Sequence, residues 1–266
     1  MAIKLLAVDI DDTLTEKADA VSPRNIRAIR AAGEAGVMVT LATGRCEVGA
    51  RPICEAIGLR GPAIYFGGSC VKDTRDGRTL LFQGVAPELV QEILGYAHAL
   101  GVHAQIYQGD YVIFEEPCAF TERYTSFQNL PFRVEKDIRS RLYGDVPKVL
   151  VYAPTMEDEP ALRAAFTERF AGRAAVSRSG PQYVEINAIG ATKGNALAWL
   201  AAYLGVAREE TAAAGDSYLD ISMIRWAGTG VCMTNGVQEA RDAADVIAPP
   251  CGEDGLAQFI ETNILR

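Results

Sequence analysis

The sequence has few of the residues that bind transition metals or highly charged polymers. Only two histidines occur in 266 residues, and none of the six cysteines belongs to a C-x-x-C pair. Zinc sites need clustered Cys and His ligands, so we expect none here. The net charge of −8, without any basic block, argues against nucleic acid and anionic membranes as partners. We expect no signal peptide or membrane span, and therefore a cytoplasmic monomer or homodimer with reduced thiols.

The order of segments predicts an α/β protein. Apolar residues make up 49% of the chain, which allows a substantial core in one large domain or two smaller ones. Near both ends, short apolar segments alternate with segments that carry helix signals, such as Ser22, Pro23 and Gly36 around a first helix. This alternation is typical of βαβ units. We expect parallel strands at residues 3–10, 37–42, 63–68, 211–216, 229–234 and 245–250.

The middle of the chain has a different pattern. Most Tyr and Phe residues lie between about Gly84 and Ile186, in short strand-like segments. Gly109-Asp110 separates two of these segments and indicates a hairpin. Helix-like stretches at residues 86–101 and 155–172 separate others. We therefore predict a Rossmann-like α/β core, residues 1–83 and 187–266, interrupted by an α+β domain, residues 84–186, with helices on one face of an antiparallel sheet.

Three aspartates and one lysine fall at the ends of the core elements. Asp9 and Asp11 follow the first strand, Asp216 ends the strand at 211–216, and Lys193 begins a helix. Ligands bind beyond the carboxyl ends of parallel strands, and a helix N-terminus favours an anion. Three carboxylates at one edge repel each other unless a cation lies among them, and hard oxygen ligands favour Mg²⁺. Mg²⁺ and Lys193 would then hold a phosphate group, with a hydrogen bond from Thr43.

This arrangement predicts phosphoryl transfer to a carboxylate. A carboxylate beside Mg²⁺ can attack phosphorus in line and form an aspartyl-phosphate. A second carboxyl group two residues further on can protonate the leaving alkoxide and then deprotonate the water that hydrolyses the intermediate. The sequence thus indicates an enzyme of phosphoryl transfer.

Four segments carry a resemblance to a known family. The run Asp9-Ile-Asp-Asp-Thr-Leu14, "LATGR" ending at Arg45, Lys193 and "GDSYLD" ending at Asp220 resemble motifs one to four of the haloacid dehalogenase superfamily. The long insert resembles the type IIB cap of Cof-like phosphatases, which implies small phosphorylated metabolites, with sugar phosphates as the expected substrates. The resemblance implies Asp9 as nucleophile, Asp11 as general acid/base, and Mg²⁺ held by Asp9, the backbone carbonyl of Asp11, and Asp216. It further implies phosphate or substrate contacts from Thr43, Gly44, Arg45 and Lys193, with Asp220 acting through a water or a hydrogen bond.

Some assignments stay open at the level of the sequence. Arg45 can contact substrate or cap, or simply pair with a surface acid, and Asp220 can simply be an acid favourable to a helix N-terminus. Leu219 stands where the family usually has Asn, and Gly67-Gly68 stands where an Asn-Gly pair is frequent. Both departures remove a polar group expected near the phosphate or substrate.

Two other functions fit the same motifs. A phosphosugar mutase, similar to phosphomannomutases, would form the same intermediate on Asp9 and return the phosphoryl group to a sugar. A non-catalytic module would instead be phosphorylated on Asp9 and signal by its conformation, as receiver domains do, although those chains are about half this length. The identity of the product separates the first of these from a phosphatase, and the lifetime of the aspartyl-phosphate separates the second.

Overall fold

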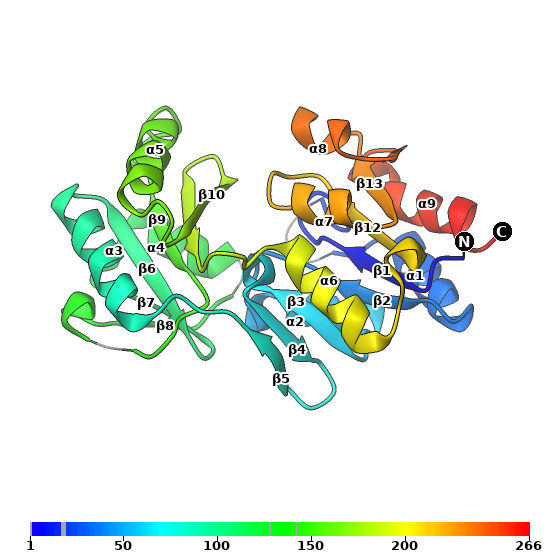
Figure 1. The fold of residues 1–266 in the computed structure, drawn as a ribbon, viewed down its shortest axis with the longest axis horizontal. Coiled ribbons are helices and arrows are strands. Elements are labelled where there is room, and N and C mark those ends of the chain that lie inside the picture. Colours follow the sequence, from blue (N-terminus) through cyan, green and yellow to red (C-terminus); the bar gives the residue numbers. More distant parts are fainter. Residues whose placement is uncertain (1, 17–19, 128, 142) are drawn as a thin grey trace. The chain divides into compact units, whose positions relative to one another are not determined.

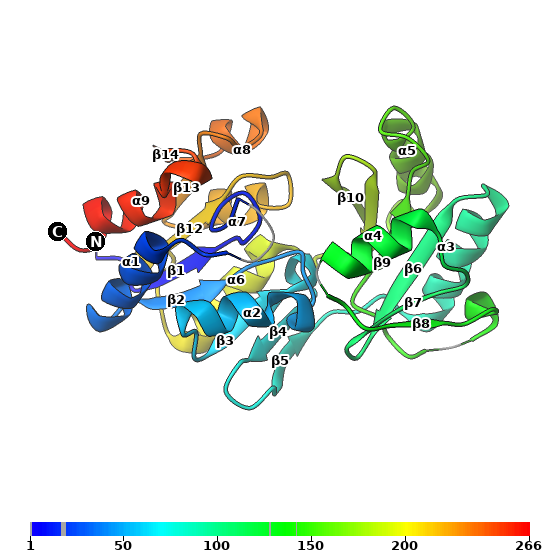
Figure 2. The same ribbon diagram turned by 180° about the vertical axis from the view of Figure 1, so that it is seen from behind.

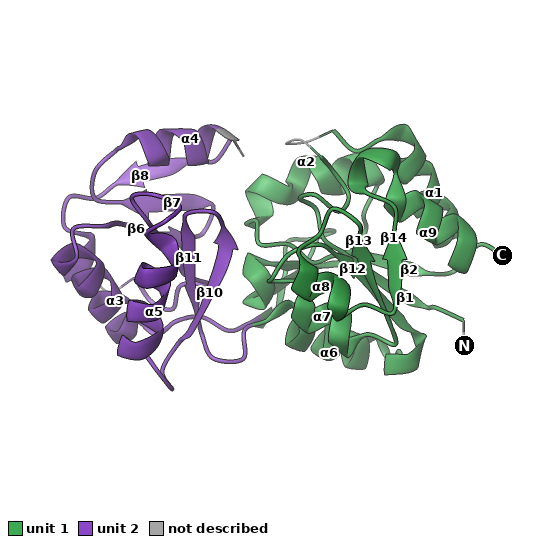
Figure 3. Ribbon diagram, turned by 90° about the horizontal axis from the view of Figure 1, so that it is seen from above, with its two compact units in different colours: residues 1–81, 192–266 green, residues 82–191 purple. Residues whose placement is uncertain are grey.

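A computed structural model describes residues 2–16, 20–127, 129–141 and 143–266. The chain forms two compact units (Figure 3). Unit 1 is built from Met1–Leu81 and Thr192–Arg266, and unit 2 from Phe82–Ala191. The sequence placed the junctions at residues 83/84 and 186/187, whereas the chain crosses between the units at 81/82 and 191/192.

Unit 1 contains a five-stranded parallel sheet in the order β14-β13-β12-β1-β2 (Figure 2). All four residues of β1 are buried, as expected for an interior strand of a sheet with both faces covered. The predicted parallel α/β core is therefore confirmed. Its strands are β1 (Leu5–Val8), β2 (Met38–Leu41), β12 (Thr211–Gly215), β13 (Thr229–Met233) and β14 (Val246–Ala248).

Helices cover both faces of this sheet. Leu5 and Ala7 of β1 pack in one apolar cluster with residues of α6 and α7, whereas α1 and α9 lie side by side on the other face (Figures 1 and 2). Ser22 caps α1 by accepting a hydrogen bond from the Asn25 N–H, as its position predicted. The helices of unit 1 are α1 (Pro23–Glu34), α2 (Glu47–Ile57), α6 (Lys193–Leu204), α7 (Ile221–Trp226), α8 (Gln238–Asp242) and α9 (Gly255–Asn263).

The expected third parallel strand belongs to a different sheet. β3 (Pro62–Tyr65) pairs antiparallel with β4 (Cys70–Asp73), which continues to β5 (Thr79–Phe82). A single parallel bridge between Ala42 and Ile64 joins β3 to the end of β2, so the predicted direction of this strand is confirmed at that bridge. The prediction that it belongs to the parallel sheet was wrong, because the chain turns back directly after Tyr65 and β3 takes its ladder partner from the next segment.

Unit 2 contains a six-stranded, mainly antiparallel sheet in the order β10-β11-β9-β6-β7-β8. Helices α3 (Pro87–Ala99) and α5 (Glu159–Arg169) share an apolar cluster with alternate residues of its central strands. The hairpin predicted around Gly109-Asp110 joins β6 to β7. The strands are β6 (His103–Gln108), β7 (Tyr111–Phe114), β8 (Phe132–Val134), β9 (Val149–Tyr152), β10 (Ala175–Gly180) and β11 (Tyr183–Asn187).

Helix α4 (Ala119–Phe127) was not expected from the sequence. Its Phe120 stacks on Tyr152, with ring centroids 3.6 Å apart, and also contacts Tyr183. Side chains alternate along strands, so Tyr152 points away from the face that Val149 and Val151 present to α3 and α5. The prediction that helices cover one face only was therefore wrong. Short 3-10 helices occupy Phe66–Gly68, Ile138–Ser140, Arg208–Glu210 and Cys251–Glu253.

Candidate active site

Asp9 and Lys193 meet at the carboxyl edge of the parallel sheet. Asp9 directly follows β1, and Lys193 is the first residue of α6, whose N-cap Thr192 accepts a hydrogen bond from the Asn195 N–H. The Lys193 Nζ lies 2.6 Å from Asp9 Oδ1 and 2.6 Å from Asp220 Oδ1. All three side chains are buried. One ammonium group therefore bridges two carboxylates inside the protein.

Asp216 and Asp220 complete a cluster of acids around this lysine. Asp216 follows β12, and Asp220 lies immediately before α7. One carboxylate oxygen from each of Asp9, Asp216 and Asp220 lies within 4.8 Å of the other two. The backbone N–H and hydroxyl of Ser217 donate to Asp220 Oδ2 at 2.9 and 2.6 Å. These hydrogen bonds fix the orientation of the Asp220 carboxylate.

The loop after β1 adds a hydroxyl group to the cluster. Asp12 has φ +58°, in the left-handed region, and its N–H donates to the Thr15 carbonyl. This turn brings the Thr13 hydroxyl to within 2.8 Å of Asp216 Oδ1, to which it donates. Thr13 is completely buried, so the loop is fixed to the end of β12.

The electrostatics of the cluster favour binding a cation. Burial and then the neighbouring Asp220 carboxylate raise the pKa of Asp9 well above its usual value. The same two causes raise the pKa of Asp216 to about 7. Burial by itself lowers the pKa of Lys193, but the carboxylates of Asp220 and Asp9 raise it overall, so the ammonium stays charged. One lysine against three clustered carboxylates, two of them buried, leaves a negative charge that a further cation would neutralise.

The donor set fits Mg²⁺. It consists of carboxylate oxygens alone, and among the described residues no His or Cys belongs to such a cluster. The sequence named Asp9, Asp216 and the backbone carbonyl of Asp11 as metal ligands. In the structure, the third carboxylate beside Asp9 and Asp216 is that of Asp220.

The carboxylate of Asp11 is bound by Arg45. Arg45 Nε donates to Asp11 Oδ2 at 3.0 Å and Arg45 Nη2 donates to Asp11 Oδ1 at 2.6 Å. A third group, Nη1, donates to the Gly49 carbonyl in the first turn of α2 at 3.0 Å. The sequence left open whether Arg45 contacts substrate, the cap or an acid. In the structure it pairs with an acid, Asp11 of motif one.

Thr43 and Gly44 lie in the loop that follows β2. Thr43 is completely buried, its N–H donates to the Ile64 carbonyl, and its hydroxyl accepts from the Arg45 N–H at 3.1 Å. A Cβ on Gly44 would lie 3.6 Å from Leu219 Cδ1. Leu219, which replaces the family's usual Asn, thus places an apolar methyl group beside this loop.

Gly68 allows the turn after β3 to approach Lys193. It has φ +112°, and a Cβ here would overlap the Thr192 carbonyl group and lie 2.7 Å from the Lys193 backbone nitrogen. The neighbouring Phe66 and Gly67 also have positive φ values, 53° and 68°. Gly68 therefore serves close backbone packing against the start of α6, and Gly67 supplies a left-handed backbone position in the same turn.

Sequence reasoning missed Thr13 and Ser217 as members of the site. Both lie inside quoted motifs, in "DIDDTL" and "GDSYLD", and their hydroxyls donate to Asp216 and Asp220. Buried carboxylates need hydrogen-bond donors, and a hydroxyl within a few residues of such an acid is the signal that could have identified them.

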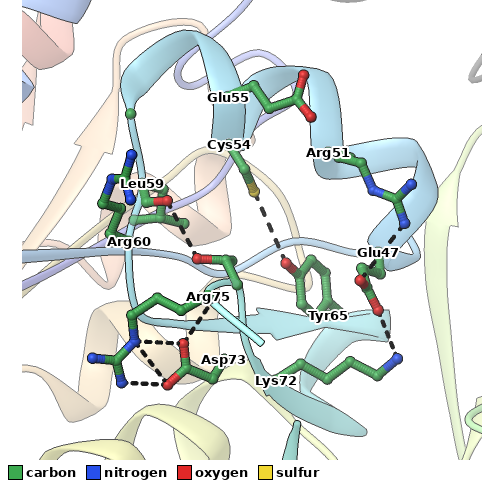
Figure 4. A pocket seen from close by; sticks show the side chains of 12 residues that line it. Glu47, Arg51, Cys54, Glu55, Leu59, Arg60, Tyr65, Lys72, Asp73 and Arg75 are labelled. Atoms are coloured by element: carbon green, nitrogen blue, oxygen red, sulfur yellow. Dashed lines mark hydrogen bonds and ion pairs between the residues drawn. The ribbon is translucent and has the colours of Figure 1, made fainter. Parts of the chain in front are cut away.

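A separate cavity of about 440 Å³ lies against α2 and the β3–β4 hairpin (Figure 4). Its walls include Glu47, which is 2.6 Å from Lys72 Nζ and 3.7 Å from Arg51 Nη2. None of the predicted site residues lines it. The ion pair between Glu47 and Lys72 holds the first turn of α2 against β4.

Comparison with known proteins identifies phosphatases that are similar to this chain over nearly its whole length. The chain is 29% identical to the pyridoxal phosphate phosphatase YbhA of Escherichia coli, over the full length of both. It is 30% identical to the 5-amino-6-(5-phospho-D-ribitylamino)uracil phosphatase YcsE of Bacillus subtilis, covering 99% of this chain and 96% of YcsE.

Solved structures share the fold, and the family model covers almost the whole chain. A haloacid dehalogenase-like hydrolase from Bacteroides thetaiotaomicron superposes with a TM-score of 0.87 at 27% identity, covering 97% of this chain and 98% of that one. The subclass IIB sugar phosphatase BT4131 has a TM-score of 0.82 at 22% identity, with 97% and 98% covered, which shows the two-unit fold alone. The model of the haloacid dehalogenase-like hydrolases matches residues 6–260. YbhA and YcsE are both named as phosphatases. The chain therefore belongs to the haloacid dehalogenase-like hydrolases.

Proposed function

We propose that this protein is a Mg²⁺-dependent phosphatase that hydrolyses small phosphomonoesters through an aspartyl-phosphate on Asp9. The observation that supports this most directly is the buried Asp9 carboxylate, bridged by Lys193 and surrounded by Asp216 and Asp220 at the carboxyl edge of the sheet. The Asp9 carboxylate can act as the nucleophile, and the Lys193 ammonium beside it can attract a phosphate dianion. The phosphatase relatives support the same reaction.

Binding of the phosphate group follows from the groups around Asp9. The Lys193 ammonium contributes positive charge, and the backbone N–H groups at the start of α6 contribute the positive end of the helix dipole. We assign Thr43 and Gly44 to the phosphate-binding loop after β2. Mg²⁺, held by Asp9, Asp216 and the Asp11 carbonyl with Asp220 in support, would neutralise charge on the phosphate and on the acids.

The reaction needs two proton transfers, both of which we assign to Asp11. An Asp9 oxygen attacks phosphorus, the P–O bond to the leaving group breaks, and the Asp11 carboxyl group gives its proton to the leaving alkoxide. The Asp11 carboxylate then takes a proton from water as that water attacks the aspartyl-phosphate. Inorganic phosphate leaves, and Asp9 returns to its carboxylate form.

We propose small phosphorylated metabolites, sugar phosphates among them, as substrates. The relatives named above act on pyridoxal phosphate and on a phosphorylated ribityl compound, both small monoesters. We assign unit 2, residues 82–191, the role of a cap domain that excludes bulk water during the reaction and selects the leaving group.

The test is release of inorganic phosphate from a panel of esters: hexose and pentose phosphates, phosphoglycolate, pyridoxal phosphate and flavin mononucleotide. Wild type is assayed with Mg²⁺ and with EDTA, beside Asp9→Asn and the surface control Asp76→Asn. We expect release that requires Mg²⁺, persists in the control and disappears in Asp9→Asn. Release that survives Asp9→Asn would rule out Asp9 as the nucleophile. A migrated phosphoryl group in place of free phosphate would indicate a mutase.

A further inference from the structure

Arg45 is bound entirely within the protein. Its side chain is 2% exposed, and three different nitrogens of the guanidinium donate to protein acceptors: two to the Asp11 carboxylate and one to the Gly49 carbonyl. The pair with Asp11 is bidentate, the geometry in which a planar guanidinium fixes both the position and the plane of a carboxylate. The three bonds engage every nitrogen of the guanidinium, so a phosphate ligand would have to share these nitrogens with Asp11 and Gly49.

The surroundings of Arg45 fix the guanidinium in this place. The Arg45 backbone is also held in place: its N–H donates to the Thr43 hydroxyl, and its carbonyl accepts from the Phe66 N–H at 2.9 Å. The Gly49 carbonyl belongs to the turn of α2 that Glu47 ties to Lys72 of β4 (Figure 4). Arg45 therefore connects the loop after β1 to α2 through a short series of direct contacts.

Asp11 differs from its partner in exposure. The Asp11 side chain is 47% exposed, whereas Arg45 is buried. The carboxylate thus keeps a free side from which it can reach a leaving group or a water. A half-exposed aspartate without a partner would sample several rotamers, and catalytic groups that move by about 1 Å lose on the order of 10²-fold in rate.

We propose that Arg45 is a positioning residue that holds the Asp11 carboxyl group in place for proton transfer, and that it does not bind the phosphate of the substrate. This inference rests on the proposed function, because it takes Asp11 as the general acid and base. It replaces the phosphate or substrate contact that the motif resemblance implies for Arg45. The geometry assigns the guanidinium to the Asp11 carboxylate and to the Gly49 carbonyl.

The dependence on the leaving group tests this role. An alkyl phosphate needs a proton on its leaving oxygen, whereas p-nitrophenolate departs without one. In Arg45→Lys and Arg45→Met we expect kcat on an alkyl phosphate to fall by about 10²-fold. The burst of p-nitrophenol, which reports transfer to Asp9, should change less than about threefold, and KM should change little. Lysine keeps the charge but lacks the planar fork, so it should not restore the rate.

A double variant separates positioning from a general structural role. If Arg45 acts only through Asp11, Arg45→Met adds no further loss of kcat to Asp11→Asn. The control is Arg24→Lys, because Arg24 makes a similar bidentate pair with Glu261 on the surface of unit 1. In this variant, kcat on the alkyl phosphate and the burst of p-nitrophenol should both stay at the wild-type values.

Three results would overturn the proposal. Equal losses on both substrates, in step with a lower thermal midpoint, would mean that Arg45 only stabilises the fold. A raised KM together with weaker inhibition by inorganic phosphate would make it a phosphate ligand. A wild-type protein that releases no phosphate from any ester in Mg²⁺ would refute the proposed function and this inference with it. The first two results differ from this one because the wild type is active in them.

Discussion

Replacing Asp220 with asparagine keeps the shape of the side chain and removes its charge. Asp220 is completely buried, its Oδ1 accepts from Lys193, and its Oδ2 accepts from the N–H groups of Asp216 and Ser217 at 3.2 and 2.9 Å and from the Ser217 hydroxyl. Asparagine offers one acceptor oxygen and one NH₂ group. The NH₂ group of asparagine must then face either the Lys193 ammonium or the N–H groups of Asp216 and Ser217, all of which are donors.

The size of the effect follows from these contacts. Removing one partner of a buried ion pair costs about 3–5 kcal/mol, and a buried N–H left without an acceptor costs about 1–3 kcal/mol. Loss of the Asp220 charge also relieves repulsion, since this carboxylate raises the pKa of both Asp9 and Asp216. We therefore expect Asp220→Asn to lower the free energy of unfolding of unit 1 by about 2–4 kcal/mol in Mg²⁺-free buffer.

Urea unfolding followed by tryptophan fluorescence measures this change. Both tryptophans of the chain, Trp199 and Trp226, lie on α6 and α7, so their signal reports unit 1. The control is Glu261→Gln, which removes an exposed carboxylate paired with Arg24 and should cost less than about 1 kcal/mol. If Asp220→Asn were as stable as this control, or more stable than wild type, repulsion among the acids would outweigh their hydrogen bonds, and the reasoning would be refuted.

Three further predictions concern other features of the molecule. Because burial and Asp220 raise the pKa of Asp216 to about 7, the folded Mg²⁺-free protein binds a proton that the unfolded chain has lost above pH of about 4. The stability contribution of this group therefore decreases as pH rises towards 7, and Mg²⁺ binding near pH 6.5 should release a proton, seen as a buffer-dependent heat in calorimetry. In unit 2, breaking the buried Lys148–Glu185 pair by Glu185→Leu alone should cost about 3–5 kcal/mol, and adding Lys148→Met should restore most of it in a double-mutant cycle. Gly68→Ala should reduce phosphate release and the thermal midpoint more than Gly77→Ala, because only the Gly68 Cβ meets backbone; equal effects would contradict the proposed packing.

The parts of the site that follow a regular pattern could be predicted from the sequence. Asp9, Asp216 and Lys193 come at the ends of strands and the start of a helix, and parallel topology brings those ends to one edge. The partner of Arg45 could not be predicted in this way. The Arg45 side chain donates both to Asp11 in the loop after β1 and to the Gly49 carbonyl in the first turn of α2. Its pairing with Asp11 therefore depends on where α2 begins.

The errors in the fold have similar causes. β3 has the apolar composition of a parallel strand, but the antiparallel turn after Tyr65 determines its sheet. Helix α4 has a weak apolar stripe, and its aromatic residues fit a strand equally well. In both cases, contacts distant in sequence outweigh the local preference.

The discontinuous construction of unit 1 has a consequence for the order of folding. β1 pairs with β12, Leu5 with Thr211, so the central ladder of the sheet cannot form until nearly the whole chain is available. Unit 2 is continuous and carries its own apolar cluster, so its residues can collapse earlier during synthesis. Asp9 therefore stays in water until Lys193 reaches it, and the bridge between them forms only when the two segments of unit 1 have joined.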